Sequence, residues 1–271
     1  MNLGLDGKTA VVTGGSKGIG YAAARGFLLE GADVVICARD KAQVEKAVLE
    51  LEKECGAFGR ILGITADMTR EEDAYRTAKT AYEVFGSVDC WVNNVGASFP
   101  KNGDEYRTED IRRITDVCFS SVIYGTQAAF RYMKETGGSI VNISSLAARC
   151  PTVGASTLYG PLKAAVVHLA VTFAGEYGAY GVRVNAVLPG FTATPAVAAT
   201  ITPEYLKRNA DGTLLRRVAR PEEIADAILF LSSERASYIT GASLEASGGR
   251  SIVLNPEFSY EKKAAIEAAE K

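Results

Sequence analysis

Tyr159 and Lys163 stand four residues apart, and Ser145 precedes the tyrosine by fourteen residues. If Tyr159 and Lys163 share a helix, their side chains lie on one face, one turn apart. The lysine ammonium group would then favour the phenolate and bring the tyrosine pKa from about 10 toward neutral pH. Such a tyrosine can donate a proton to a carbonyl oxygen or accept one from an alcohol. The same spacing also occurs on solvated helix faces, so other features must decide.

The composition limits the class of protein. The chain has 271 residues, 47% of them hydrophobic, and we expect one large domain. Its net charge of -2 and its scattered basic residues predict no nucleic-acid or membrane partner. Five widely spaced cysteines without a C-x-x-C pair, and a single histidine, predict a reduced protein without a metal site. No signal peptide or bilayer-length apolar run is visible, so we expect a cytoplasmic protein.

Apolar runs alternate with helical patterns along most of the chain. We expect strands at 8–13, 32–38, 60–67, 87–94, 137–145, 181–190 and 241–246. We expect helices after the first glycine turn and at 41–54, 71–86, 108–134, 157–178 and 221–234. The strands are continuously apolar, which is typical of a parallel sheet covered by helices on both faces. The pattern predicts a single doubly wound α/β domain of about seven strands over residues 1–250.

Two segments stand outside this alternation. Residues 192–215 follow a strand end and carry small apolar residues and two prolines. Because ligands of such sheets bind beyond the carboxyl ends of the strands, we expect this segment to form a lid over the substrate. Residues 251–271 form a C-terminal extension that ends in a helical pattern. This extension is either a solvated surface helix or a contact with a neighbouring subunit.

The segment TGGSKGIG at 13–20 places Gly14, Gly18 and Gly20 between the first strand and the first helix. Without side chains at these positions, the backbone can turn tightly and approach a pyrophosphate at the helix N-terminus. A plain turn with a helix cap is the alternative interpretation. The segment favours a dinucleotide cofactor.

The end of the second strand indicates which dinucleotide binds. An acidic residue there would bind the ribose 2′-hydroxyl of NAD, but position 38 is alanine. Arg39 and Lys17 could together hold a 2′-phosphate. Asp40 is better placed to cap the helix that starts at Lys41. We therefore expect NADP as the cofactor and NAD as the alternative.

Five motifs occur in a fixed order: TGGSKGIG, NNVG at 93–96, NISS at 142–145, YGPLK at 159–163 and LPGFTAT at 188–194. With these motifs the chain resembles the short-chain dehydrogenase/reductase family from about Leu5 to Gly249. The resemblance implies a Rossmann-type fold and an NAD(P)-dependent oxidoreductase. It also implies a homo-oligomer, a dimer or tetramer built on the helices at 108–134 and 157–178.

The resemblance implies a role for each matching residue. Tyr159 would be the acid/base, Lys163 would lower its pKa and bind the nicotinamide ribose, and Ser145 would hydrogen-bond the substrate oxygen. Asp67 would contact the adenine. The full set of expected cofactor-binding residues is Gly14, Ser16, Lys17, Gly18, Ile19, Gly20, Arg39, Asp67, Met68, Asn93, Gly96, Tyr159, Lys163, Pro189, Gly190, Thr192 and Thr194.

Some positions depart from the family pattern. Val95 replaces the usual alanine, and Cys118 occupies the position of an asparagine that aids a proton relay. A thiol is a poor substitute for an amide, although Cys118 could also be a buried small hydrophobe or a reactive thiol. The gap between Ser145 and Tyr159 is one residue longer than usual, which leaves Ser144 as a backup for the serine.

Two further residues in this region need a local explanation. Pro161 is unusual between Tyr159 and Lys163, but it is tolerable in the first turn of a helix. His168 follows Lys163 by five residues and therefore lies off its face. We expect it to be packed or at a subunit contact, and not catalytic.

These observations predict an NADP-dependent oxidoreductase that interconverts a secondary alcohol and a ketone. Apolar residues of the lid and its surroundings suggest a cyclic, apolar substrate such as a steroid or bile acid, although they could simply pack the lid. These residues are Phe99, Phe191, Ala196, Val197, Ala198, Ala199, Ile201 and Leu206.

Three alternatives remain open at this point. A 3-oxoacyl thioester would require a basic docking patch for its acyl carrier, for which Lys101 and Arg149 are candidates. A cyclic alcohol or polyol is also possible as substrate. A third hypothesis, prompted by Cys118, is an NADP(H)-binding sensor with little turnover.

Overall fold

The computed structural model describes residues 2–151, 153, 156–199, 201–250, 252–253 and 255–269. Within these residues, seven parallel strands form one sheet in the order β3-β2-β1-β4-β5-β6-β7. The predicted doubly wound, Rossmann-type fold is confirmed. The strands are β1 (Thr9–Thr13), β2 (Asp33–Ala38), β3 (Ile61–Thr65), β4 (Cys90–Asn93), β5 (Gly138–Ile143), β6 (Val182–Pro189) and β7 (Ser243–Ala246).

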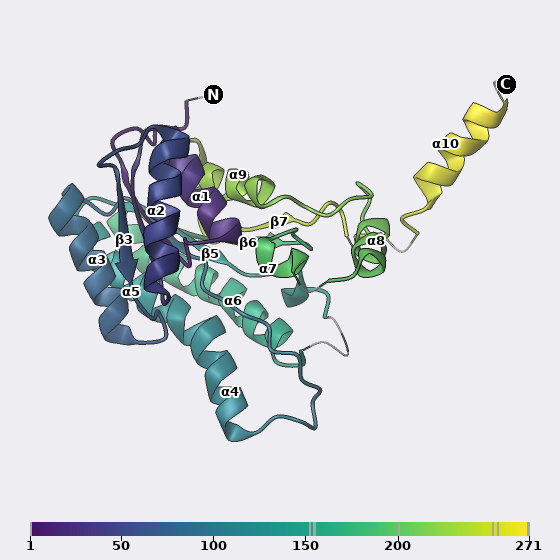
Figure 1. Cartoon of the computed structure of the whole chain (residues 1–271), viewed down its shortest axis with the longest axis horizontal. Helices are drawn as coiled ribbons and strands as arrows, with labels where there is room; N and C mark the ends of the chain where they lie inside the picture. The colour runs from purple at the N-terminus through teal and green to yellow at the C-terminus, as the bar shows by residue number, and fades with distance from the viewer. Residues whose placement is uncertain are drawn as a thin grey trace.

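Helices cover both faces of the sheet (Figure 1). On one face, α1 (Gly18–Leu29), α2 (Lys41–Cys55) and α9 (Pro221–Ser232) pack on one set of strand residues. On the other face, α3 (Glu71–Phe85), α5 (Ser121–Met133) and α6 (Tyr159–Tyr177) pack on the alternate set. Both faces of the central strands are therefore buried, because successive strand side chains point to opposite faces.

The strand order reverses direction between β1 and β4. The chain runs outward from β1 to β3 on one side and from β4 to β7 on the other. In sheets of this kind, ligands bind at the carboxyl ends of the strands where the order reverses. The turns that follow β1 and β4 lie at this edge, and both carry predicted site residues.

The helix predicted over 108–134 is interrupted. It consists of α4 (Thr108–Thr115), a π-helical turn η1 (Asp116–Ser120) and α5. The N–H of Ser121 donates to the carbonyl oxygen of Asp116, five residues back, which marks the extra residue of a π-bulge. Cys118 lies inside this turn.

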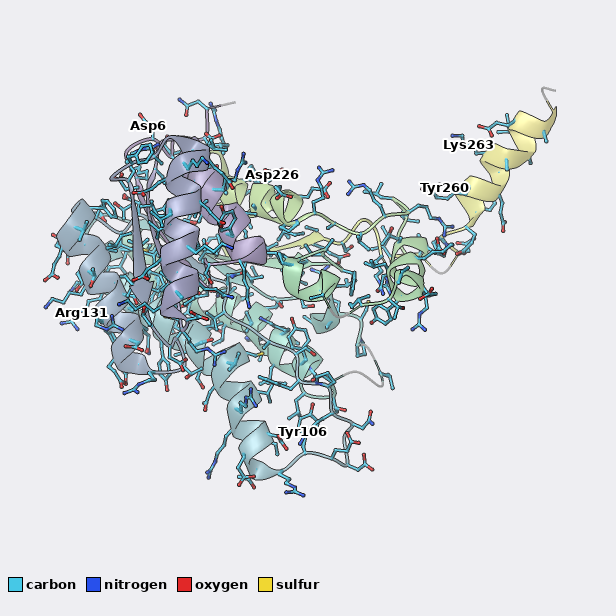
Figure 2. All side chains as sticks on the ribbon, in the orientation of Figure 1. Asp6, Tyr106, Arg131, Asp226, Tyr260 and Lys263 are labelled. Atoms are coloured by element: carbon cyan, nitrogen blue, oxygen red, sulfur yellow. The ribbon has the colours of Figure 1, made fainter. Side chains whose placement is uncertain are left out.

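The N-terminus of α6 explains Pro161. The helix begins at Tyr159, so Pro161 is its third residue, where an N–H would have no partner in the helix. Upstream of Tyr159, the hydroxyl of Tyr106 lies 3.2 Å from Oγ of Ser156 and accepts the N–H of Leu158 at 3.5 Å. Figure 2 labels Tyr106 in the loop before α4. This loop, which sequence reasoning did not single out, therefore anchors the start of α6.

The two segments outside the alternation also have helices. The expected lid contains α7 (Pro195–Ala198) and α8 (Pro203–Asp211), each preceded by a threonine whose hydroxyl caps it. The tail contains α10 (Phe258–Ala269), which extends away from the sheet and has no buried residue (Figure 1). Short turns η2 (Leu146–Ala148), η3 (Gly178–Tyr180) and η4 (Glu234–Ala236) complete the described helices. None of these helices has the length and apolar character needed to cross a membrane.

Candidate functional site

The glycine loop joins β1 to α1 in a shape that side chains would prevent. Gly14 and Gly18 have φ values of 64° and 60°, in the left-handed region. A Cβ on Gly20 would lie 2.4 Å from the carbonyl oxygen of Gly14. Ser16 and Ile19, between these glycines, are half-buried. The loop thus leaves the N-terminal N–H groups of α1 open to an anion, and a cofactor pyrophosphate fits here.

Asn94, which sequence reasoning missed, braces this loop from β4. Its Nδ2 donates to the carbonyl oxygens of Thr13 at 3.0 Å and Gly14 at 3.2 Å. Its backbone N–H also donates to Oγ1 of Thr13. The motif NNVG placed a second asparagine beside Asn93, and strand alternation indicates that the two side chains point in opposite directions.

Asn93 itself has a buried and fully occupied side chain. Its Oδ1 accepts from Nε1 of Trp91 at 2.7 Å, and its Nδ2 donates to Thr126 at 3.0 Å and to Asn142 at 2.9 Å. The side chain therefore ties β4 to α5 and β5. Only the backbone of Asn93 is left to face the expected adenosine side of a cofactor.

Lys17 and Arg39 are exposed at the edge where the cofactor is expected. Among the described residues, neither side chain takes part in a hydrogen bond or ion pair. The carboxylate of Asp40 accepts the N–H of Gln43 at 3.1 Å, so the predicted N-cap of α2 is confirmed. Arg39 at the end of β2 and Lys17 in the glycine loop are thus unpaired cations within the described residues, and Asp40 caps α2.

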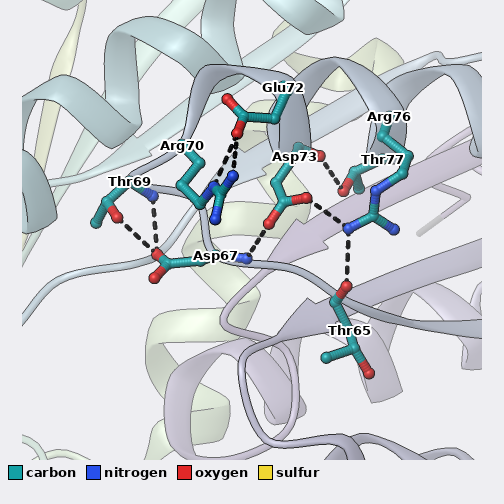
Figure 3. A network of polar contacts seen from close by, with 8 residues as sticks. All are labelled: Thr65, Asp67, Thr69, Arg70, Glu72, Asp73, Arg76 and Thr77. Carbon is teal, nitrogen blue, oxygen red and sulfur yellow. Dashed lines mark hydrogen bonds and ion pairs between the residues drawn. The ribbon is translucent and has the colours of Figure 1, made fainter.

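Asp67 and Met68 follow β3 on the same edge. Met68 is buried, and Asp67 is half-buried. Oδ1 of Asp67 accepts the N–H of Thr69 at 3.0 Å and its hydroxyl at 2.8 Å, which forms a tight local turn (Figure 3).

Ser145, Tyr159 and Lys163 meet at the carboxyl end of β5. Oγ of Ser145 accepts the N–H of Ala147 at 3.1 Å, and the serine side chain lies near enough to Tyr159 to lower the pKa of its phenol. Nζ of Lys163 lies 5.8 Å from the centroid of the Tyr159 ring and donates to the carbonyl oxygen of Ile143 at 2.8 Å. It also lies 2.9 Å from the point where a Cβ on Gly96 would stand. The three expected residues are brought together.

Burial dominates the ionisation of this cluster. Burial raises the pKa of Tyr159 to about 12, although the Ser145 side chain partly opposes the shift. Burial also lowers the pKa of Lys163. The expectation that Lys163 brings the tyrosine pKa toward neutrality stays a prediction, since burial sets the pKa of Tyr159 in this structure. The Lys163 ammonium group is bound to Ile143, several ångströms from the ring, and the desolvation of the phenol outweighs its charge.

Ser144 is not a backup for Ser145. Its hydroxyl is buried and donates to the carbonyl oxygen of Lys163 at 2.7 Å. The bond occupies the only proton of this hydroxyl, so Ser144 has none to offer a substrate.

Cys118 is completely buried beside this cluster. Its Sγ donates to the carbonyl oxygen of Ala97 at 3.2 Å. A charge on this sulfur would raise the pKa of both Tyr159 and Lys163, which indicates how near it lies to them. The prediction of a small buried side chain is confirmed. His168, in contrast, is exposed on α6, so of its two expected environments packing within the chain is excluded and contact with another subunit stays a prediction.

The chain after β6 approaches the glycine loop. Pro189 is the last residue of β6, and a Cβ on Gly190 would lie 2.8 Å from Cα of Ser247. Thr192 forms an isolated parallel β-bridge with Ala219. Thr194 caps α7, and its Cγ2 lies 3.2 Å from the point where a Cβ on Gly18 would stand. The beginning of the expected lid is therefore next to the pyrophosphate cradle.

Phe99 and Phe191, the aromatic residues expected near the lid, have packing partners. The guanidinium of Arg113 lies 4.4 Å from the ring centroid of Phe99. The rings of Phe191 and Tyr205, on α8, have centroids 5.7 Å apart. The side chains of Ala196 and Ala198 lie outside the described residues.

Lys101 and Arg149, the candidates for an acyl-carrier patch, are both paired with acidic residues. Nζ of Lys101 lies 2.5 Å from the carboxylate of Asp110. Nη1 of Arg149 lies 3.1 Å from Glu245. Within the described part of the chain, no group of three or more histidine, cysteine, aspartate or glutamate side chains is arranged to hold a metal ion.

Comparison with known proteins identifies the family. Residues 14–251 match the family model described as enoyl-(acyl carrier protein) reductase. Glucose 1-dehydrogenase 2 of Bacillus subtilis (strain 168) is 35% identical over 255 residues, which cover 93% of this chain and 98% of that protein.

Two solved structures share the fold over nearly their whole length. One is a 7α-hydroxysteroid dehydrogenase complexed with NADH and 7-oxo glycochenodeoxycholic acid. It has a TM-score of 0.87 and 34% identity, with 94% of this chain and 98% of that one covered. The other is L-sorbose reductase from Gluconobacter frateurii complexed with NADPH and L-sorbose. It has a TM-score of 0.87 and 30% identity, with coverage of 94% and 100%. The chain thus belongs to the short-chain dehydrogenase/reductase family, and it is an NAD(P)-dependent oxidoreductase acting on alcohols and ketones.

Proposed function

We propose that this enzyme uses NADP to interconvert a secondary alcohol and a ketone, and that its substrate is a cyclic, apolar molecule of the steroid or bile-acid type. The observation that carries the reaction is the cluster of Ser145, Tyr159 and Lys163, in which Lys163 is buried and the other two are half-buried. The cofactor and the substrate class rest on separate observations.

The choice of NADP rests on charge at the end of β2. Lys17 and Arg39 are exposed cations without a partner among the described residues. A 2′-phosphate accepts charge-assisted hydrogen bonds from such groups. Oδ1 of Asp40 caps α2 through the N–H of Gln43, which gives this carboxylate a structural role at the helix start.

The chemistry follows from the protonation of the cluster. When bound, the nicotinamide exchanges a hydride with the carbon that carries the substrate oxygen. Tyr159 is protonated at neutral pH, so it can donate its proton to the carbonyl oxygen during reduction. Ser145 hydrogen-bonds the same oxygen and stabilises the charge that develops on it. Lys163 holds the nicotinamide ribose from beside Gly96.

The substrate class rests on the lid. Phe191 packs against Tyr205 on α8, and most of the segment's other residues near the site are small and apolar. The neighbour solved with a bile acid supports this proposal, whereas the sugar-binding neighbour keeps a cyclic alcohol or polyol open.

A 3-oxoacyl thioester is the second candidate because the matching family model carries an acyl-carrier description. The pairing of Lys101 with Asp110 and of Arg149 with Glu245 disfavours it, since an acidic carrier needs free cations. The similarity to a dehydrogenase disfavours the sensor hypothesis.

We also propose the organisation of the chain. Residues 1–250 would form a single catalytic domain with a lid over 192–215, and 251–271 would form an extension. Exposed residues on α6, among them His168 and Val171, favour a homo-oligomer built on α5 and α6. Five free cysteines fit a cytoplasmic protein. Light scattering after gel filtration measures the oligomeric state.

The test of the proposed reaction is nicotinamide oxidation, followed by absorbance, with NADPH and NADH against ketosteroids, bile-acid ketones, cyclic ketones, ketoses and a 3-oxoacyl thioester. We expect turnover of the steroid or bile-acid ketones with NADPH. Preference for NADH would contradict the cofactor proposal, and preference for another ketone would contradict the substrate proposal. Tyr159→Phe is the control: it should lose turnover by a factor of about 10²–10⁴ and still bind cofactor.

A further inference from the structure

We propose that Asp73 is a positioning residue for the adenine end of the cofactor: it fixes the turn after β3 so that the Asp67 carboxylate faces the adenine amino group. The inference rests on the proposed contact between Asp67 and adenine. It adds a residue on α3 to a site otherwise built from strand ends and the loops that follow them.

Asp73 connects the turn to the helix and to the strand end (Figure 3). Its Oδ2 accepts the backbone N–H of Asp67 at 2.8 Å. Its Oδ1 lies 2.6 Å from Nη2 of Arg76, and the same nitrogen donates to the carbonyl oxygen of Thr65 at 2.9 Å. The end of β3, the turn and α3 are thereby held together.

These bonds fix the carboxylate of Asp67 from two sides. Asp73 holds the peptide N–H of Asp67, and Thr69 holds its Oδ1 with two hydrogen bonds. Among the described residues, Oδ2 of Asp67 has no hydrogen-bond partner. A charged oxygen whose position is fixed and which lacks a donor is suited to an exocyclic amino group such as that of adenine.

The bonds of Asp73 are not those of an ordinary helix cap. Arg70 is the N-cap of α3, and Asp73 is the third residue of the helix. An acidic residue at this position commonly reaches back to the N–H of the N-cap residue. Asp73 instead accepts the N–H of Asp67, three residues before the N-cap. Its carboxylate therefore stabilises the turn and not the start of the helix.

Asp73 also stays ionised at neutral pH. Burial opposes its charge, but the hydrogen bonds from Arg76 and from the Asp67 N–H lower the pKa of Asp73 below its ordinary value. A carboxylate is a stronger acceptor for the Asp67 N–H than a neutral group would be.

The test compares the dissociation constants of NADPH and deamino-NADPH, in which an oxygen replaces the adenine amino group. The full-length protein is titrated by cofactor fluorescence. We expect Asp73→Ala to weaken NADPH by roughly fivefold to tenfold and deamino-NADPH by less than about twofold. Asp73→Asn keeps an oxygen that can accept the Asp67 N–H and should restore NADPH binding. Glu71→Ala is the matched control, because it removes an exposed acid from the same helical turn.

Several outcomes would overturn the inference. If Asp73→Ala weakens the binding of both cofactors equally, Asp73 has a general structural role. If neither dissociation constant changes, Asp73 does not position the adenine end. If the wild-type protein binds the two cofactors equally, the Asp67 contact itself fails, and this inference fails with it while the proposed reaction stands. If NADH proves to be the cofactor, NADH and deamino-NADH give the same comparison.

Discussion

The hydroxyl of Ser144 donates a hydrogen bond to the backbone carbonyl oxygen of Lys163, and the two oxygens are 2.7 Å apart. The bond joins the end of β5 to the first turns of α6, where Tyr159 is located. Ser145 makes different contacts, with Ala147 and with the phenol of Tyr159. Adjacent serines thus make separate contacts: Ser144 holds the helix, and Ser145 is the one that we propose to face the reacting oxygen.

This division predicts that two alanine variants affect different properties, kcat in one and stability in the other. Ser145→Ala should lower kcat by a factor of about 10²–10³, because it removes a donor to the developing oxyanion. Ser144→Ala should lower the free energy of unfolding by about 1 kcal/mol, because a buried hydrogen bond is lost. Steady-state kinetics and urea unfolding separate the two effects. An equal loss of kcat in both variants would contradict the division.

The pH dependence of the reaction should follow the pKa of Tyr159, which burial raises to about 12. Reduction requires the protonated phenol, which persists below this pKa, so its rate at saturating cofactor should stay level from about pH 6 to about pH 10. Oxidation requires the phenolate, whose fraction increases with pH, so its rate should rise throughout this range. The two directions are measured in the same series of buffers. An oxidation rate that levels off near neutrality would show that the tyrosine ionises there.

Features that depend on local periodicity could be predicted from the sequence. Continuous apolar strands alternate with amphipathic helices, and this alternation determines a parallel doubly wound sheet. The spacing of Tyr159 and Lys163 on one helix likewise predicts their proximity. The glycine loop followed from the residue types, since Gly14 and Gly18 adopt φ values that other residues avoid.

Features that depend on individual side-chain contacts, across turns or between distant segments, could not be predicted. Asp73 reaches six residues back to Asp67, and Asn94 reaches a glycine loop eighty residues away. The roles of Ser144 and Ser145 depend on the direction in which each side chain points after β5. The extra residue between Ser145 and Tyr159 prevented the sequence from showing which serine faces the tyrosine. The pKa of Tyr159 is set by burial, which the spacing of Lys163 does not reveal.

Lys17 and Arg39 should control the choice of cofactor. The double variant Lys17→Ala/Arg39→Ala should lower kcat/KM for NADPH by about 10-fold to 100-fold, because two charge-assisted contacts to the 2′-phosphate are lost. The value for NADH should change little. Lys41→Ala is the control, because Lys41 is a nearby exposed cation already paired with Glu45 at 3.7 Å. A parallel loss with both cofactors would mean that the two cations do not recognise the 2′-phosphate.

The cysteines should differ sharply in their reaction with a thiol reagent. Cys37, Cys90 and Cys118 are buried, and burial raises the pKa of the first two to about 12. Cys55 and Cys150 are only half-buried. Titration of the native protein with a chromogenic disulfide should therefore label at most these two quickly, with turnover retained, and all five after unfolding. Rapid labelling of Cys118, identified by mass spectrometry, would instead indicate a reactive thiol at the site.

The C-terminal helix should influence the proposed lid over 192–215, because a hydrogen bond joins the helix to the end of this segment. The hydroxyl of Tyr260 donates to the carbonyl oxygen of Leu214 at 2.6 Å. The guanidinium of Arg216 lies 4.7 Å from the Tyr260 ring centroid and 3.7 Å from Glu257. Figure 2 labels Tyr260 at the start of α10, on the side toward α8. Residues beyond 251 lie outside the family model, so this contact is an addition to the matched fold.

Removal of residues 256–271 should therefore raise KM for the ketone by roughly threefold to tenfold, since the end of the lid segment loses a hydrogen bond and two contacts to Arg216. The dissociation constant of the cofactor should stay unchanged, because the glycine loop lies elsewhere. Tyr260→Phe removes only the bond to Leu214 and should have a smaller effect in the same direction. Unchanged KM in the truncated enzyme would show that the helix does not support the lid. Weaker cofactor binding would show that the truncation disturbs the fold beyond the lid segment.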